Sequence, residues 1–413
     1  MMRRSIILFV LISLFALELY ASGGSLYSRF GKGDVYLYNF GREMGLAGGG
    51  YSLGSASNIS LNNPAGLYKL QLTRFETGFT FDGVNLSGDE SIFYSNTAFS
   101  GFAFAIPIDK DLGFSAALGM SPVTRVEFEV FEEVTDTPFD PHKISYAGKG
   151  GISKVFLSTS FITPIDFVIG ASFEYYTGKI DNEASIDFEP GSFYDSKYTT
   201  RQGHYGVGLN LGLITPDLSN LLGIESLSNI RLGASYNFIP NLKTDTSFIS
   251  YSSLGTSELV SDVVETKIPG RLGVGLSFEM KKAFLFTLDF VTQAWSKYEF
   301  NGEKVKQLRD LNHFNIAFEY KIPDSRDETL WEQLTYRGGL SYEQTQYEIN
   351  GKGIDQLGIH GGFSYPFTKT SSIDVGLMFG MRGTKESNLL KEYIYQIAVS
   401  ISFGELWFQR DER

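Results

Sequence analysis

The sequence predicts an all-β protein: a transmembrane antiparallel β-barrel of about 14 strands, with an N-terminal hatch that plugs the lumen. Three observations predict this fold. Side chains alternate with a period of two residues in many segments, the connections between those segments alternate in length, and the amino terminus has the pattern of an export signal.

The alternation is clear between Tyr393 and Gly404. The odd positions there are large and apolar, whereas most even positions are small or polar, as at Gln396, Ser400 and Ser402. A period of two places the two sets of side chains on opposite faces of a strand, in two different environments. The same pattern recurs at 205–213, 231–238 and 373–382.

Segments of this kind number about fourteen, and most run about 10 to 14 residues, enough to cross a membrane at a tilt. They begin near Leu70, Tyr94, Leu112, Gly151, Phe167, Gln202, Asn229, Ile268, Ala283, Leu311, Tyr336, Asp355, Ser372 and Glu392.

The connections between the segments alternate in length. Short ones at 107–111, 163–166 and 280–282 take turns with long polar ones, predicted as loops, at 127–149, 181–201 and 241–267. Outer-membrane barrels have this asymmetry, with short periplasmic turns and longer outer loops. Two connections on the short side, at 216–228 and 323–334, are longer than this rule predicts. We expect them to contain short helices.

A secreted two-sheet sandwich is the alternative fold, because its strands alternate equally well. The number and length of the segments favour the barrel. So does their polar face, which carries mostly Gly, Ala and Ser where a water-facing sheet would carry Lys, Glu and Thr. Charged residues make up 20% of the chain, below the usual share of roughly 25%.

Composition and motifs exclude several functions. The formal charge of −12 argues against a nucleic-acid partner, since phosphate binding needs a basic surface. The chain has no cysteine and no nucleophile-elbow or phosphate-loop motif. We therefore predict no enzyme activity, no catalytic residue, no cofactor and no metal site. The histidines lack metal-ligand spacing; they are His142, His204, His313 and His360.

The amino terminus indicates export. Arg3 and Arg4 precede an apolar run, and small residues follow at Ala21 and Ser22, as in a secretory signal peptide. We predict a signal peptide at 1–21. No later stretch approaches the roughly 18 apolar residues of a spanning helix, so the predicted location is the outer membrane.

Residues 22–69 lack strand alternation and are rich in glycine. Low side-chain bulk suits a compact plug packed against a barrel wall. The segment ends in the turn formed by Asn63, Pro64, Ala65 and Gly66, in which proline fixes its own φ and glycine allows a reversal. Any tight turn before a strand could use the same residues.

These features resemble the FadL/TodX family of outer-membrane transporters for hydrophobic compounds. The resemblance is strongest at GLAGGGYSLGSASNISLNNPAGL, and IPGRLGVGLSF followed by FTLDFVTQAWSKYEF is a second matching stretch. It implies a hatch at 22–69 that ends in the Asn-Pro-Ala motif and gates substrate passage through Asn63, Pro64, Ala65 and Gly66. It also implies a barrel at 70–404 and a kink in its third strand that opens a side exit into the membrane.

Pro122 is the candidate for that kink. It lies inside the third predicted strand, Leu112 to Val130, and proline cannot donate to a strand ladder, so it occurs at edges and bulges. The alternative is that Pro122 ends a shorter strand. The sequence departs from many barrels at its carboxyl end, where 405–413 form a short periplasmic tail beyond the last predicted strand.

The resemblance implies passive uptake of long-chain fatty acids or other hydrophobic compounds by a monomer in contact with outer-membrane lipid. The alternative is a PorV-like barrel, a subunit that acts as a partner in protein secretion. A purely structural barrel is the third reading.

Overall fold

The computed structural model describes residues 24–406, apart from 88–90, 136–140, 189–193, 225, 240, 254, 323–328 and 330. The predicted signal peptide at 1–21 lies outside the described residues. So does the predicted tail at 405–413, except for its first two residues.

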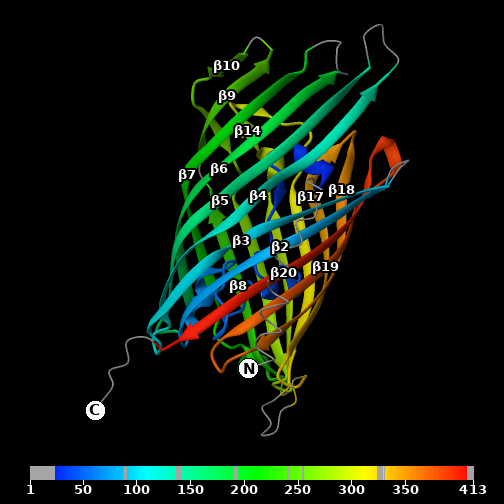
Figure 1. Ribbon diagram of the computed structural model, residues 1–413. Helices are drawn as coiled ribbons and strands as arrows, with labels where there is room; N and C mark the ends of the chain where they lie inside the picture. The colour runs from blue at the N-terminus through cyan, green and yellow to red at the C-terminus, as the bar shows by residue number, and fades with distance from the viewer. Residues whose placement is uncertain are drawn as a thin grey trace.

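The chain forms a closed antiparallel barrel of 14 strands (Figure 1). Each strand pairs with the next along the chain, and the last pairs with the first over the whole length from Thr73↔Glu405 to Ser87↔Lys391. The all-β fold and the strand number predicted from the sequence are therefore confirmed.

The fourteen barrel strands follow the fourteen predicted segments in order. Two of them are interrupted: β8 and β9 both pair with β7 and act as one strand, and β10, β11 and β12 together act as the next. The strands are β2 (Thr73–Ser87), β3 (Ser91–Asp109), β4 (Phe114–Val134), β5 (His142–Ile162), β6 (Val168–Phe188), β7 (Ser196–Ile214), β8 (Leu227–Phe238), β9 (Leu242–Ser252), β10 (Gly255–Val260), β11 (Val264–Lys267), β12 (Arg271–Met280), β13 (Phe284–Gln293), β16 (Leu311–Lys321), β17 (Thr335–Ile349), β18 (Lys352–Pro366), β19 (Ser372–Gly383) and β20 (Lys391–Glu405).

The remaining elements are short. The longest helix among the described residues has six residues, and no helix in this part of the chain is long and apolar enough to cross a membrane. A short helix lies in the connection at 216–228, as predicted. These elements are η1 (Leu26–Arg29), β1 (Asp34–Val35), α2 (Gly41–Gly45), η2 (Pro64–Lys69), α3 (Ser219–Leu222), η3 (Trp295–Lys297), β14 (Glu299–Phe300), β15 (Glu303–Lys304) and η4 (Glu386–Asn388).

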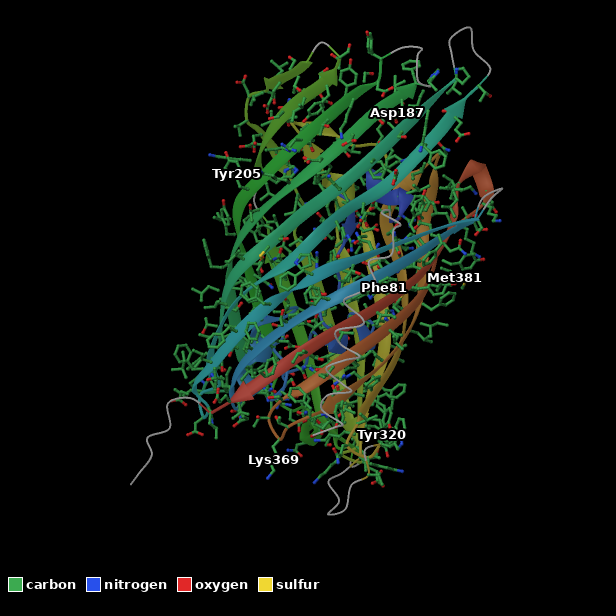
Figure 2. The ribbon with its side chains drawn as sticks, viewed as in Figure 1. Phe81, Asp187, Tyr205, Tyr320, Lys369 and Met381 are labelled. Carbon is green, nitrogen blue, oxygen red and sulfur yellow. The ribbon has the colours of Figure 1, made fainter. Side chains whose placement is uncertain are left out.

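The prediction of long loops at 127–149, 181–201 and 241–267 is wrong. Most of these residues continue the strands, so that β4, β5 and β6 have 21 residues each. Figure 2 shows Asp187, near the end of β6, at one end of the barrel, with Tyr320 and Lys369 at the opposite end. The barrel wall is therefore tall on the side of β4 to β10, and this projecting part is here called the upper sheet (Figure 1).

Residues 24–72, here called the inner segment, run inside the barrel (Figure 1). Phe40, Met44, Leu46 and Ala65 are almost completely buried against the wall. The inward faces of the strands therefore pack against a chain segment and do not line an open channel.

Candidate functional site

Asn63 fixes the end of the inner segment to the wall. Its side-chain oxygen accepts a hydrogen bond from the Ala65 amide at 3.0 Å and caps η2. Its side-chain nitrogen donates to the Tyr51 carbonyl at 2.6 Å, and to the carbonyls of Leu213 in β7 and Ala234 in β8 at 3.3 Å each. Asn63 is fully buried, so this one amide ties the predicted turn to two barrel strands.

Glycines in the wall make room for the turn. A Cβ on Gly212 of β7 would clash with the Asn63 side-chain oxygen, and one on Gly170 of β6 would clash with the Ala65 amide nitrogen. Close backbone approach is a use that only glycine permits. The small residues on the inward face of these strands are thus explained by contact with Asn63 and Ala65.

The rest of the inner segment is held by polar wall residues. The Asp289 carboxylate accepts from the amides of Gly50 and Tyr51 at 3.1 and 3.0 Å. The rings of His313 and His360 donate to the carbonyls of Ala47 and Met44 at 3.0 and 2.9 Å. These two histidines are far apart in sequence and anchor the same short stretch of backbone.

A buried ion network lies beside these anchors. Arg337 donates to Glu319 at 2.7 Å and to Asp374 at 2.9 Å, and Arg42 of the inner segment contacts Glu319 at 3.2 Å. The side chains of Arg337 and Asp374 are 3% and 0% exposed. Because an isolated buried charge is costly, the loss of one member would destabilise the wall, and Arg42 joins the inner segment to the same network.

The wall is incomplete next to Pro122. Among the described residues, β3 and β4 pair only from Asp109↔Phe114 to Phe102↔Met120. Beyond Met120, β3 pairs only with β2, because it bends away at Gly101, whose φ is +107°. The ladder between β4 and β5 continues but shifts register between Pro122 and Thr124. Pro122 therefore does not end the strand; it lies where the wall parts.

The inner segment fills part of this gap. Its strand β1 pairs antiparallel with β4 through Asp34↔Arg125 and Val35↔Thr124. The Tyr36 amide adds a hydrogen bond to the Val123 carbonyl at 2.9 Å. The inner segment thus supplies β4 with the partner that β3 does not provide.

Charged side chains cross the gap on the lumenal side. Arg125 of β4 donates to Asp82 of β2 at 2.6 Å, and it also pairs with Glu127. Asp82 accepts a further hydrogen bond from Gln396 of β20 at 2.7 Å. Arg125 therefore links the two sides of the gap.

A cavity of about 100 Å³ lies behind the gap. Asn96 of β3, Arg125 and Glu127 of β4, Asp34 of β1 and Arg382 of β19 are among its lining residues. A smaller cavity of about 40 Å³ is lined by Pro122 and by Asn62, the residue that precedes the predicted turn. No group of histidine, aspartate and glutamate in the described residues is arranged to hold a metal ion.

Sequence reasoning did not identify the charged residues at the gap. Asp82, Arg125, Glu343 and Arg382 come from different strands, and no spacing in the sequence predicts that they meet. Asn63 to Gly66 could be found because they form one local turn.

Lys32 is an unusual group of the inner segment. It is 3% exposed, its ammonium donates to Gln202 at 2.7 Å and it lies over the Phe300 ring. Among the described residues no carboxylate pairs with it. Burial without a counter-charge lowers the pKa of Lys32 to about 7.

Lys32 is expected to make the folded state more stable as pH rises from 7 to 10. The unfolded chain keeps this proton up to its ordinary pKa, whereas the folded protein loses it near pH 7, so stability rises by about 1.4 kcal/mol per pH unit in that window. The Lys32→Met variant should lack this component in thermal unfolding. Burial raises the pKa values of Tyr27 and Tyr36 to about 12, so their opposing effect begins only above pH 10. Equal pH slopes for the two proteins would contradict the assignment.

Comparisons with known proteins agree with this architecture. A family model described as BamG matches residues 1–412. A search among curated proteins found no match.

Solved structures share the fold at low sequence identity. A Pseudomonas aeruginosa FadL homologue matches with a TM-score of 0.64 at 12% identity, over 90% of this chain and 99% of that one. The Ralstonia pickettii toluene transporter TbuX matches with a TM-score of 0.58 at 17% identity, over 89% and 97%. The P. putida toluene transporter TodX matches with a TM-score of 0.57 at 16% identity, over 91% and 100%. The predicted resemblance to FadL/TodX-type barrels is thereby confirmed.

Proposed function

The chain belongs to the BamG family, and we propose that it is an outer-membrane channel for passive uptake of hydrophobic compounds, long-chain fatty acids among them. The observation that carries this proposal is the gap between β3 and β4, closed from inside by β1 and backed by a cavity. The similar folds of the toluene transporters TbuX and TodX support it.

Entry is proposed to begin at the upper sheet. Tyr146, Ala184 and Tyr198 lie opposite one another on one face of it, and Tyr146 and Tyr198 are 51% and 60% exposed. Ile180, on the same face of β6, packs against Leu26 of the inner segment, so this face looks toward the lumen. An apolar compound that binds there gains about 25 cal/mol for each Å² of apolar surface removed from water.

Passage is proposed to require movement of the inner segment, which acts as the hatch. A cavity of about 100 Å³ is smaller than the roughly 300 to 1,000 Å³ of typical ligand pockets. A long acyl chain therefore needs space that residues 33–36 and the turn at Asn63 to Gly66 now occupy. When β1 leaves β4, the gap beside Pro122 becomes a sideways exit into the membrane, with no nucleotide needed.

A disulfide between β1 and β4 is expected to block uptake. Val35 and Thr124 are directly opposite, and cross-strand Cα distances of about 4.5 to 5.5 Å suit a disulfide. The chain has no cysteine of its own, so Val35→Cys with Thr124→Cys makes a single bridge. In proteoliposomes, uptake of a labelled fatty acid and of toluene should fall at least tenfold when oxidised and recover on reduction.

The matched control is Ser158→Cys with Ser172→Cys, a pair that is opposed within the wall, with hydroxyl oxygens 2.8 Å apart. That bridge joins β5 and β6, which already pair along their whole length, so uptake should not change. Full uptake by the oxidised Val35–Thr124 variant would refute lateral release at this gap.

The PorV-like partner role is the second candidate. The upper sheet favours it, because the edge of β10 pairs only with β9 in the described residues and all six of its residues are exposed. An unpaired edge can accept an extended segment of another protein. A stable protein partner that is lost from purified material on shortening β9 and β10, together with unaltered uptake, would favour this reading over transport.

A further inference from the structure

The cavity behind the gap has an unusual charge balance. It is lined by four carboxylates and two guanidinium groups: Asp34, Asp82, Glu127, Glu343, Arg125 and Arg382. Glu392 lies behind Arg382 at 3.7 Å. The lining thus holds twice as many carboxyl groups as guanidinium groups.

Glu343 is the carboxylate without an arginine or lysine partner. Arg382 pairs with Asp34, and Arg125 pairs with Asp82 and Glu127. In the described residues, the Glu343 carboxylate has a polar contact only with His313, whose Nδ1 lies 3.3 Å away. Glu343 is 9% exposed and lines the cavity.

The His313 contact does not satisfy Glu343 fully. The other ring nitrogen of His313 donates to the Ala47 carbonyl at 3.0 Å. A neutral ring has only one N–H, so Nδ1 then faces the carboxylate as a second acceptor unless an additional proton is bound. A buried carboxylate in this position favours an external hydrogen-bond donor with positive charge.

The rest of the lining suits a small organic group. Val84, Met378 and Ile394 form one apolar cluster and line one side of the cavity. Tyr36 and Tyr38 also line it, and aromatic faces attract cations. Apolar contacts next to a carboxylate fit an alkylammonium better than a hydrated inorganic ion.

We propose that this cavity binds the cationic, amine-bearing head of an amphipathic compound, with Glu343 as its acceptor and the apolar cluster against its first methylenes. This inference rests on the proposed function, because it names the chemical class of a compound that would follow the proposed route. A fatty-acid carboxylate should pass this cavity without binding in it, because like charges repel in a site that excludes water.

The test is equilibrium binding of short probes to the purified full chain in detergent, which needs no transport. n-Butylammonium is expected to bind with a Kd on the order of 1 mM, while n-butyrate and n-butanol should bind at least tenfold more weakly. Glu343→Gln should reduce butylammonium affinity at least tenfold. The matched control is Glu386→Gln, a carboxylate 71% exposed and paired with Lys352, which should bind as the wild type does.

The proposal is overturned if the three probes bind equally, if none binds, or if Glu343→Gln binds butylammonium as well as the wild type. If that variant does not fold, the ranking of the three probes on the wild-type protein decides. If the wild-type protein takes up toluene normally but does not bind butylammonium, the inference alone is rejected. If it binds butylammonium but takes up neither toluene nor a fatty acid, the proposed function alone is rejected.

Discussion

Replacing Gly212 by leucine is expected to release the turn at Asn63 to Gly66 from the wall while the barrel stays closed. The new side chain would occupy the position of the Asn63 side-chain oxygen, so the hydrogen bonds of Asn63 to Ala65, Tyr51, Leu213 and Ala234 would be lost. Each is worth about 1 kcal/mol. Hydrogen exchange at the Ala65 and Gly66 amides should therefore accelerate by at least a hundredfold.

Gly361→Leu in β18 is the matched control, because a Cβ there meets nothing within 4 Å. It should leave exchange in the turn unchanged. Protection of β6, β7 and β8 should be the same in both variants, since their ladders do not depend on the inner segment. Slow exchange at Ala65 in Gly212→Leu would show that the turn does not need this glycine.

Replacing Arg337 by methionine is expected to destabilise the whole barrel. The substitution leaves Glu319 and Asp374 buried without their shared partner, and breaking a buried ion network in this way costs about 3 to 5 kcal/mol. Arg42 would remain the only guanidinium contact of Glu319 in the described residues. The thermal unfolding midpoint in detergent should fall clearly below that of the wild type.

Lys352→Met tests the opposite case on the same barrel. Lys352 and Glu386 form an exposed pair with side chains 48% and 71% accessible, and such pairs contribute about 0 to 1 kcal/mol. Its unfolding midpoint should stay near the wild-type value. Equal midpoints for the two variants would mean that the Arg337 network does not stabilise the barrel.

The sequence predicted the number and order of the strands because the membrane imposes a simple rule on them. Within the bilayer the outward face must be apolar, as at Phe173 and Tyr175. Further along β6 the outward positions become Lys179, Asp181 and Glu183, since this part of the strand has left the membrane. The alternation therefore weakens without the strand ending, and for this reason the upper sheet was mistaken for loops.

The candidate site was only partly predictable for a related reason. The turn at Asn63 is local, so its residues could be recognised from spacing. The two glycines that make room for this turn, Gly170 and Gly212, lie in strands more than 100 positions further along the chain. Their role depends on how the inner segment packs against those strands. The pairing of Arg125 with Asp82 depends likewise on where β3 leaves β4, which no single stretch of sequence specifies.

The pairing of β1 with β4 has a consequence for the permeability barrier of the cell. Backbone groups that face hydrocarbon without a partner cost several kcal/mol each. If Val35 and Tyr36 leave β4, another partner must therefore take their place, or the gap cannot remain open. The same residues occupy the lumen. Any change that detaches them would unseal the side of the barrel and its interior together, and the first sign would be entry of bulky antibiotics that an intact outer membrane keeps out.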